Sequence, residues 1–153
     1  MCIRDSDGNI AFGRSDMPEE EVYKYATLAA ADDFIRKTSD GYDTIIGERG
    51  VGLSGGQKQR ISLARALAVK PSVLILDDTT SAVDMETEKY IQNSLKNLDF
   101  ECTKIIIAQR ISSTKNADKI IILNNGSIED IGTHEELIAK HGYYREVYDL
   151  QTN

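Results

Sequence analysis

One short segment has the composition of a helix start that can hold an anion, Leu53-Ser54-Gly55-Gly56-Gln57. Ser54 is a favoured N-cap residue, and Gln57, three residues later, completes a capping box ahead of an amphipathic run. Gly55 and Gly56 leave the first-turn amides open, and the positive end of the helix dipole favours a phosphate there. The same residues also fit a helix cap without a ligand, so the rest of the chain must decide.

A second set of polar residues follows two short apolar runs. Asp77 and Asp78 come directly after the run 72–76, and Gln109 comes after the run 104–108. Both runs resemble strands buried on two faces of a parallel sheet, whose carboxyl ends are where ligands bind. Carboxylates in that place can hold Mg²⁺ beside a nucleotide, although an acidic pair also often ends a strand without binding anything.

Helices must position these residues. Pro18 and three glutamates open the first predicted helix, which should continue until Ser39-Asp40-Gly41 breaks it. Its buried stripe is expected to consist of residues at helical spacing, namely Val22, Tyr25, Ala26 and Ala29. The helix that starts at Ser54 should run to about Val69 and stop before Pro71.

The second half of the chain alternates strands and helices. An amphipathic helix marked by Ile91, Leu95 and Leu98 lies between the two strand-like runs, which predicts a right-handed βαβ unit. Residues 120–123 and 127–131 flank an Asn-Gly turn and predict a hairpin. Thr133 should cap a helix from His134, and another amphipathic helix should follow it. The predicted fold is α/β, with a helical subdomain at 9–70 and a sheet portion at 71–153.

Composition excludes several classes of protein. The chain has 153 residues, 41% of them apolar and 28% charged, as in a soluble globular domain. A formal net charge of −7 argues against binding nucleic acid or anionic membranes. No apolar run approaches the roughly 20 residues that span a bilayer. Cys2 and Cys102 have no metal-ligand or disulfide spacing, which favours a reducing compartment.

Seven segments in this order resemble the nucleotide-binding domain of ABC transporters of the exporter type. The resemblance extends from Asn9 to the C-terminal helix. Its parts are the segment after the Q-loop (Asn9–Gly13), the X-loop (Gly47–Gly50), the signature (Leu53–Gln57), the Walker B strand (Val73–Asp77), the D-loop (Ser81–Asp84), the switch (Ile107–Arg110) and a common exporter ending (Gly132–Leu137). Each is weak alone, but the ordered series is specific.

The resemblance implies a P-loop NTPase-like fold in which two such domains sandwich ATP head to tail. The signature, with Ser54, Gly55, Gly56 and Gln57, would bind the γ-phosphate of ATP held mainly by the partner domain. In the chain's own site, Asp77 would organise Mg²⁺, Asp78 would orient or deprotonate the attacking water, and Gln109 would sense the γ-phosphate. The D-loop, with Ser81 and Asp84, would link the two sites.

The resemblance further implies an ATP hydrolase at the cytoplasmic face of the cell membrane. The X-loop, around Glu48, would touch the transmembrane domain of an integral membrane exporter. Two other interpretations stay open: a soluble ABC-type ATPase of DNA repair or translation, and a non-catalytic nucleotide-binding fragment. His134 and His141 are expected to be surface residues, and the tyrosines of the last helix to be packing residues or part of a subunit surface.

Three departures from the family pattern qualify these expectations. The sequence has no Gly-Lys dipeptide, so the P-loop motif is missing. Residues 1–8 are expected to be a non-native or truncated start. The fragment alone is expected to be inactive. Asp78 stands where the family usually has Glu. Gln109 stands where it usually has His, and an amide carries no titratable proton. The departures at Asp78 and Gln109 predict a degenerate ATP site in one half of a heterodimeric exporter.

Overall fold

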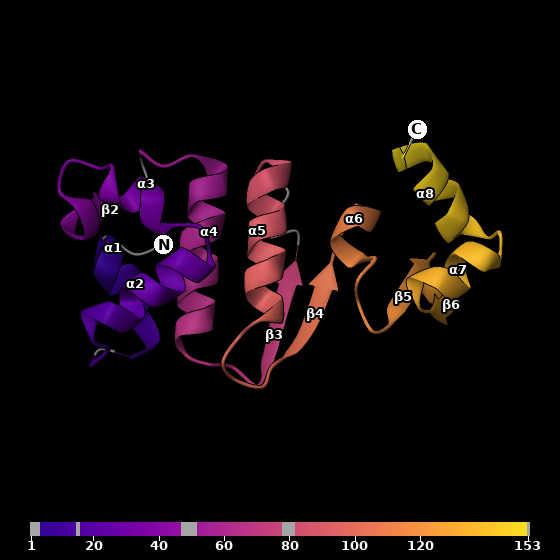
Figure 1. Ribbon diagram of the computed structural model, residues 1–153, viewed down its shortest axis with the longest axis horizontal. Coiled ribbons are helices and arrows are strands. Elements are labelled where there is room, and N and C mark those ends of the chain that lie inside the picture. The colour runs from indigo at the N-terminus through magenta and orange to yellow at the C-terminus, as the bar shows by residue number, and fades with distance from the viewer. Residues whose placement is uncertain (1–3, 15, 47–51, 78–81, 153) are drawn as a thin grey trace. The chain divides into compact units, whose positions relative to one another are not determined.

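The structure is a computed structural model that describes residues 4–14, 16–46, 52–77 and 82–152. It divides into two compact units, Met1–Ile105 and Ile106–Asn153. Each unit contains helices and strands (Figure 1), which confirms the predicted α/β class. Within the described ranges, no helix combines the length and the apolar character needed to cross a bilayer.

Short helices dominate the first unit. The α-helices are α1 (Ser6–Ile10), α2 (Glu19–Leu28), α3 (Asp32–Arg36), α4 (Gly55–Ala68) and α5 (Met85–Lys96), and the 3₁₀ helices are η1 (Ala11–Gly13) and η2 (Gly41–Asp43). Strands β1 (Arg4–Asp5) and β2 (Ile45–Ile46) pair antiparallel. Strands β3 (Val73–Asp77) and β4 (Thr103–Ile107) form a second two-stranded sheet, in which both arrows point the same way in Figure 1.

Helix α2 has the predicted start and the predicted buried face. It follows Pro18, and all four residues of the expected stripe are fully buried: Val22, Tyr25, Ala26 and Ala29. The predicted end at Ser39–Gly41 is wrong, because α2 stops at Leu28 and α3 begins only at Asp32. The break is at Ala30, which has a left-handed φ of 54°. Alanine is a strong helix former, so the residue type at position 30 does not indicate a break in the helix.

Helix α4 has the predicted length and is the element against which α1, η1 and α2 pack (Figure 1). Its buried face consists of Gly56, Ile61, Leu63, Ala64, Leu67 and Ala68. The helix ends at Ala68, and Lys70 turns out of it with a φ of 48°, directly before Pro71. The residue before a proline is disfavoured in the helical conformation, which accounts for this boundary.

Strands β3 and β4 lie where the sequence places them, but β3 is not buried on both faces. Leu74 and Leu76 are 4% and 7% exposed, whereas Val73 and Ile75 on the alternate face are 52% and 62% exposed. Ile105 of β4 is also 46% exposed. The prediction of full burial is therefore wrong for this chain, and the structure presents an apolar strand face to solvent.

We expect the isolated 153-residue chain to self-associate through this face, because an exposed apolar strand is a site of aggregation. Light scattering after size-exclusion chromatography measures the mass of the species. Ile75→Lys should shift it towards the monomer by adding a charge to the exposed face. The matched change Leu74→Lys, on the buried face, should unfold the sheet instead. A wild-type chain that stays monomeric at high concentration would contradict this expectation.

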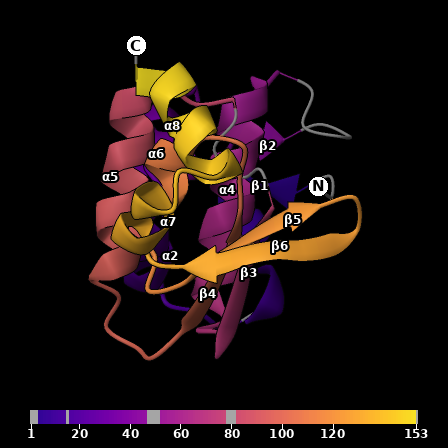
Figure 2. The same cartoon turned by 90° about the vertical axis from the view of Figure 1, so that its right-hand side faces the viewer.

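The second unit is a hairpin with helices packed on it (Figure 2). Its elements are α6 (Ile111–Thr114), β5 (Ile120–Asn124), β6 (Ser127–Gly132), α7 (His134–Ala139) and α8 (Tyr143–Thr152). The predicted hairpin is confirmed: β5 and β6 pair antiparallel, and Asn125 and Gly126 have φ values of 48° and 77°. Positive φ at both turn residues is what a two-residue turn of this kind requires.

The core of this unit joins four elements through Ile111, Ile120, Leu137 and Tyr144. Thr133 caps α7, as predicted, and the structure adds a capping box with Glu136. His134, which is expected to be a surface residue, is partly buried. Its Nδ1 lies 2.8 Å from the hydroxyl of Tyr144, and its ring packs edge-on against Tyr144 and Tyr148. Helix α7 packs against α8, so a residue in the first turn of α7 can contact α8 as well.

Candidate functional site

The first turn of α4 forms the predicted capping box. The backbone N–H of Gln57 donates to the Ser54 hydroxyl oxygen at 3.2 Å, and the backbone N–H of Ser54 donates to the Gln57 side-chain oxygen at 2.8 Å. Ser54 and Gly55 are exposed, while Gly56 is buried. The geometry therefore holds the helix start in place and leaves one side of it open to a ligand.

Gly56 is buried because the segment 82–84 lies directly against it. A Cβ added at Gly56 would come within 2.6 Å of the Ala82 carbonyl oxygen, a distance that no side chain tolerates. A Cβ at Gly55 would meet the Ala82 Cβ at 3.7 Å, which is ordinary contact. The two glycines thus have different roles: Gly56 allows close backbone approach, and Gly55 keeps the outer side open.

Gln59 is a residue of this site that the sequence analysis did not single out. Its side-chain oxygen accepts a hydrogen bond from the Ala82 N–H at 3.3 Å. Gln59 lies three residues after Gly56, so both are on one face of α4. That spacing is the signal that could have indicated it. The contact attaches the 82–84 segment to the helix whose first turn carries Ser54.

Asp84 is the N-cap of α5. Its Oδ1 accepts from the backbone N–H groups of Glu86 and Thr87 at 3.1 and 2.9 Å, and its Oδ2 accepts from the Thr87 hydroxyl at 2.8 Å. These hydrogen bonds, above all those from Thr87, lower the pKa of Asp84. Asp84 is therefore ionised at neutral pH. It is the last residue of the expected D-loop, and Ser81, the first, lies outside the described residues.

Asp77 is the last residue of β3, and its side chain is exposed. Neighbouring Asp78 lies outside the described residues, as does the expected X-loop at 47–50. In the part of the chain that the structure describes, no group of three His, Cys, Asp or Glu residues could hold a metal by itself. One accessible carboxylate at a strand end still fits Mg²⁺, which takes few protein ligands when phosphates supply the others.

Gln109 follows β4 and precedes α6, and its side chain is exposed. It belongs to the second unit, whereas Ser54, Asp77 and Asp84 belong to the first. Its backbone carbonyl accepts a hydrogen bond from the side-chain amide of Gln151 at 2.9 Å. Gln151, in the last turn of α8, is a second residue that the motifs did not indicate, because 42 residues separate the two.

The segment 9–13 is attached to α4 from the other side. The Arg65 guanidinium donates to the Asn9 backbone carbonyl at 2.7 Å and to its side-chain oxygen at 2.6 Å. It also lies over the Phe12 ring, 5.5 Å from the centroid. Asn9 is fully buried, so the two hydrogen bonds from the Arg65 guanidinium are shielded from solvent on one side. One helix therefore contacts both the expected segment after the Q-loop and the expected D-loop.

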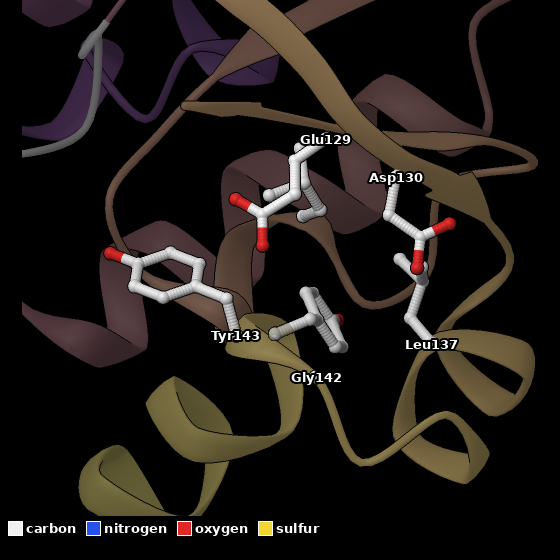
Figure 3. Close-up of a pocket in the computed structure, with 7 residues that line it drawn as sticks. Glu129, Asp130, Leu137, Gly142 and Tyr143 are labelled. Carbon is white, nitrogen blue, oxygen red and sulfur yellow. The ribbon is translucent and has the colours of Figure 1, made fainter. Parts of the chain in front are cut away.

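A small pocket of about 160 Å³ in the second unit contains none of the predicted site residues (Figure 3). Glu129 and Asp130 of β6 both line it, although neighbouring strand residues normally face opposite sides. The register explains this: Ile122 pairs with Asp130 and Leu123 with Ile128, so Glu129 is the extra residue of a bulge. Asp130 is paired with Lys140 at 2.6 Å.

The chain is similar to known proteins along nearly its whole length. Residues 6–81 match the family model described as ABC transporter. The Bacillus subtilis (strain 168) protein "Uncharacterized ABC transporter ATP-binding protein YknU" is 56% identical over 143 residues, which make up 94% of this chain and 24% of the relative. A Staphylococcus aureus (strain NCTC 8325 / PS 47) protein, whose name includes "multidrug export ATP-binding/permease protein", is 50% identical over 94% of this chain and 25% of its own length.

A solved structure gives the same result in three dimensions. The chain superimposes on the "Structure of a bacterial Atm1-family ABC exporter with ATP bound" with a TM-score of 0.95 and 37% sequence identity. The match covers 100% of this chain and 27% of that chain. The chain therefore spans about a quarter of the length of the relatives that it matches.

Proposed function

Because the chain belongs to the ABC transporter family, as an exporter-type nucleotide-binding domain, we propose that it is part of the ATP-driven motor of a membrane exporter. The first turn of α4 carries this proposal. Its Ser54 and Gly55 are exposed, its cap is complete, and its inner side is closed by the 82–84 segment. This is a rigid, open helix start, which is the arrangement that binds a phosphate group.

The chemistry of that turn suits the γ-phosphate of ATP. The first N–H groups of a helix have no partner within the helix, so the amides near Gly55 can donate to phosphate oxygens. The Ser54 oxygen accepts from Gln57, which leaves its O–H proton for a phosphate. In this proposal, the ATP bound here is held mainly by a second nucleotide-binding domain.

The chain's own ATP site lies at the strand ends and is degenerate. Asp77 holds Mg²⁺, which neutralises phosphate charge when it is bound. Asp78 is one methylene shorter than the usual Glu, and Gln109 can donate a hydrogen bond to a phosphate but cannot exchange a proton near neutral pH. This site therefore binds ATP and turns it over slowly, while Ser54–Gln57 completes the competent site of the partner.

The partners follow from this arrangement. The second domain is a different chain, so the motor is a heterodimer, and the segment around Glu48 contacts the transmembrane domain at the cytoplasmic face of the membrane. The relatives' names include export and permease, which supports an exporter over a soluble ATPase of DNA repair or translation. A net charge of −7 gives no basis for binding nucleic acid. The 153 residues alone do not hydrolyse ATP.

The test is ATP turnover of the full-length protein assembled with its partner. Ser54→Arg should remove most of the turnover, because a bulky cation occupies the place of the γ-phosphate in the competent site. Asp78→Ala should change it little, since the site that it damages is already slow. Ser62→Arg makes the same change at an exposed position two turns further along α4 and should leave turnover intact.

Two results would contradict the proposal separately. Equal turnover of the Ser54→Arg and Ser62→Arg variants would exclude the signature role of the α4 start. If Asp78→Ala removed as much turnover as the equivalent change in the partner, the two sites would be equal and the degenerate site would be ruled out.

A further inference from the structure

The side-chain amide of Gln151 forms hydrogen bonds to the backbone on both sides of Arg110. Gln151 Nε2 donates to the Gln109 carbonyl oxygen at 2.9 Å, and Gln151 Oε1 accepts from the Ile111 N–H at 2.9 Å. An amide group is planar, with its donor and acceptor in fixed positions. Two simultaneous hydrogen bonds therefore fix both the position and the orientation of the segment 109–111.

Both elements joined by these hydrogen bonds, α6 and α8, contribute to the core of the second unit. Ile111 and Tyr144 are 7% and 5% exposed and belong to the same core, so α6 and α8 are packed together. Gln151 lies seven residues after Tyr144, which is two turns of α8 and the same helix face. The amide therefore approaches the 109–111 segment from a helix that its own core contacts hold in place.

The Gln109 side chain itself remains exposed, while its backbone carbonyl accepts the hydrogen bond from Gln151. We propose that Gln151 is a positioning residue for the switch: it fixes the backbone at Gln109, so that the side chain of that residue projects towards the γ-phosphate of ATP in the chain's own site. This inference rests on the proposed function, because it assigns Gln109 to an ATP site.

The experiment uses the full-length protein assembled with its partner and has two readouts. Hydrogen–deuterium exchange measures protection of the Ile111 amide, and a photoreactive ATP analogue measures ATP retention at the site of this chain. Gln151→Ala should speed exchange of the 109–111 segment and weaken ATP retention, each by about tenfold, the scale of one to two lost hydrogen bonds. Leu150→Ala is the matched control, since that neighbour is 81% exposed.

A double variant separates positioning from a general structural role. If Gln151 acts through Gln109, then Gln151→Ala should add no further loss of ATP retention to Gln109→Ala. Additive losses would overturn the proposal, as would unchanged exchange in Gln151→Ala, or faster exchange with unchanged ATP retention. Failure of the proposed function is distinct, because the wild-type chain would then retain no ATP analogue at all.

Discussion

Replacing Gly56 with alanine is expected to remove about 99% of the ATP turnover of the assembled transporter. The added Cβ would lie 2.6 Å from the Ala82 carbonyl oxygen and 3.2 Å from a methyl group of Val83, so the 82–84 segment must move away from α4. The hydrogen bond from the Ala82 N–H to Gln59 would be broken by the same movement. A shift of about 1 Å in a reacting arrangement costs on the order of 10²-fold in rate.

Gly55→Ala is the matched control for this expectation. Its Cβ would meet Ala82 at an ordinary 3.7 Å, so the 82–84 segment should keep its place. Hydrogen–deuterium exchange of that segment distinguishes the two variants: exchange should rise in Gly56→Ala and stay at the wild-type rate in Gly55→Ala. Equal exchange in both variants would show that the close approach of Gly56 to Ala82 does not hold the segment. Turnover by itself is less selective, because a methyl group at Gly55 can also obstruct the phosphate.

Asp78→Glu combined with Gln109→His is expected to raise hydrolysis at the chain's own site by up to about 10²-fold. The reference pKa values of Asp and Glu, about 3.9 and 4.3, differ by only about half a kcal/mol, so basicity is a minor factor. Reach is the larger one, because general-base help is worth about 10²–10⁴ and depends on the position of the carboxylate. The histidine restores a group that titrates near neutral pH.

Measuring this gain requires a partner whose own catalytic carboxylate is replaced, so that only one site contributes. Asp78→Asn with Gln109→His is the control: it retains the size of Asp78 but has no base, and should give no gain. The pH profile provides a second check. Activity of the Glu/His variant should change around pH 6.5, the usual pKa of histidine, whereas the Gln109 protein has no titrating group at that position. No gain in the Glu/His variant would mean that residues other than 78 and 109 limit this site.

The candidate site could be predicted from the sequence where it depends on neighbouring residues. The capping box at Ser54 was predicted because cap and partner are three residues apart, and Thr133 was predicted as a helix cap from its residue type and position. Gln59 and Gln151 were not, because their partners are 23 and 42 residues away. Nothing in the local sequence distinguishes these two glutamines from any other polar residue on a helix. Only the packing of α4 and α8 gives them their contacts.

The sequence by itself determined much of the local structure and the family: helix starts, the end of α4 before Pro71, the Asn125-Gly126 turn, and an ordered series of motifs. These features depend on short-range hydrogen bonds and on the backbone preferences of single residues. Tertiary structure decided the break at Ala30, the contact of His134 with Tyr144, the exposed face of β3 and the bulge at Glu129. Each of these depends on which distant surface lies opposite, and the same residue types are compatible with either outcome until that surface is in place.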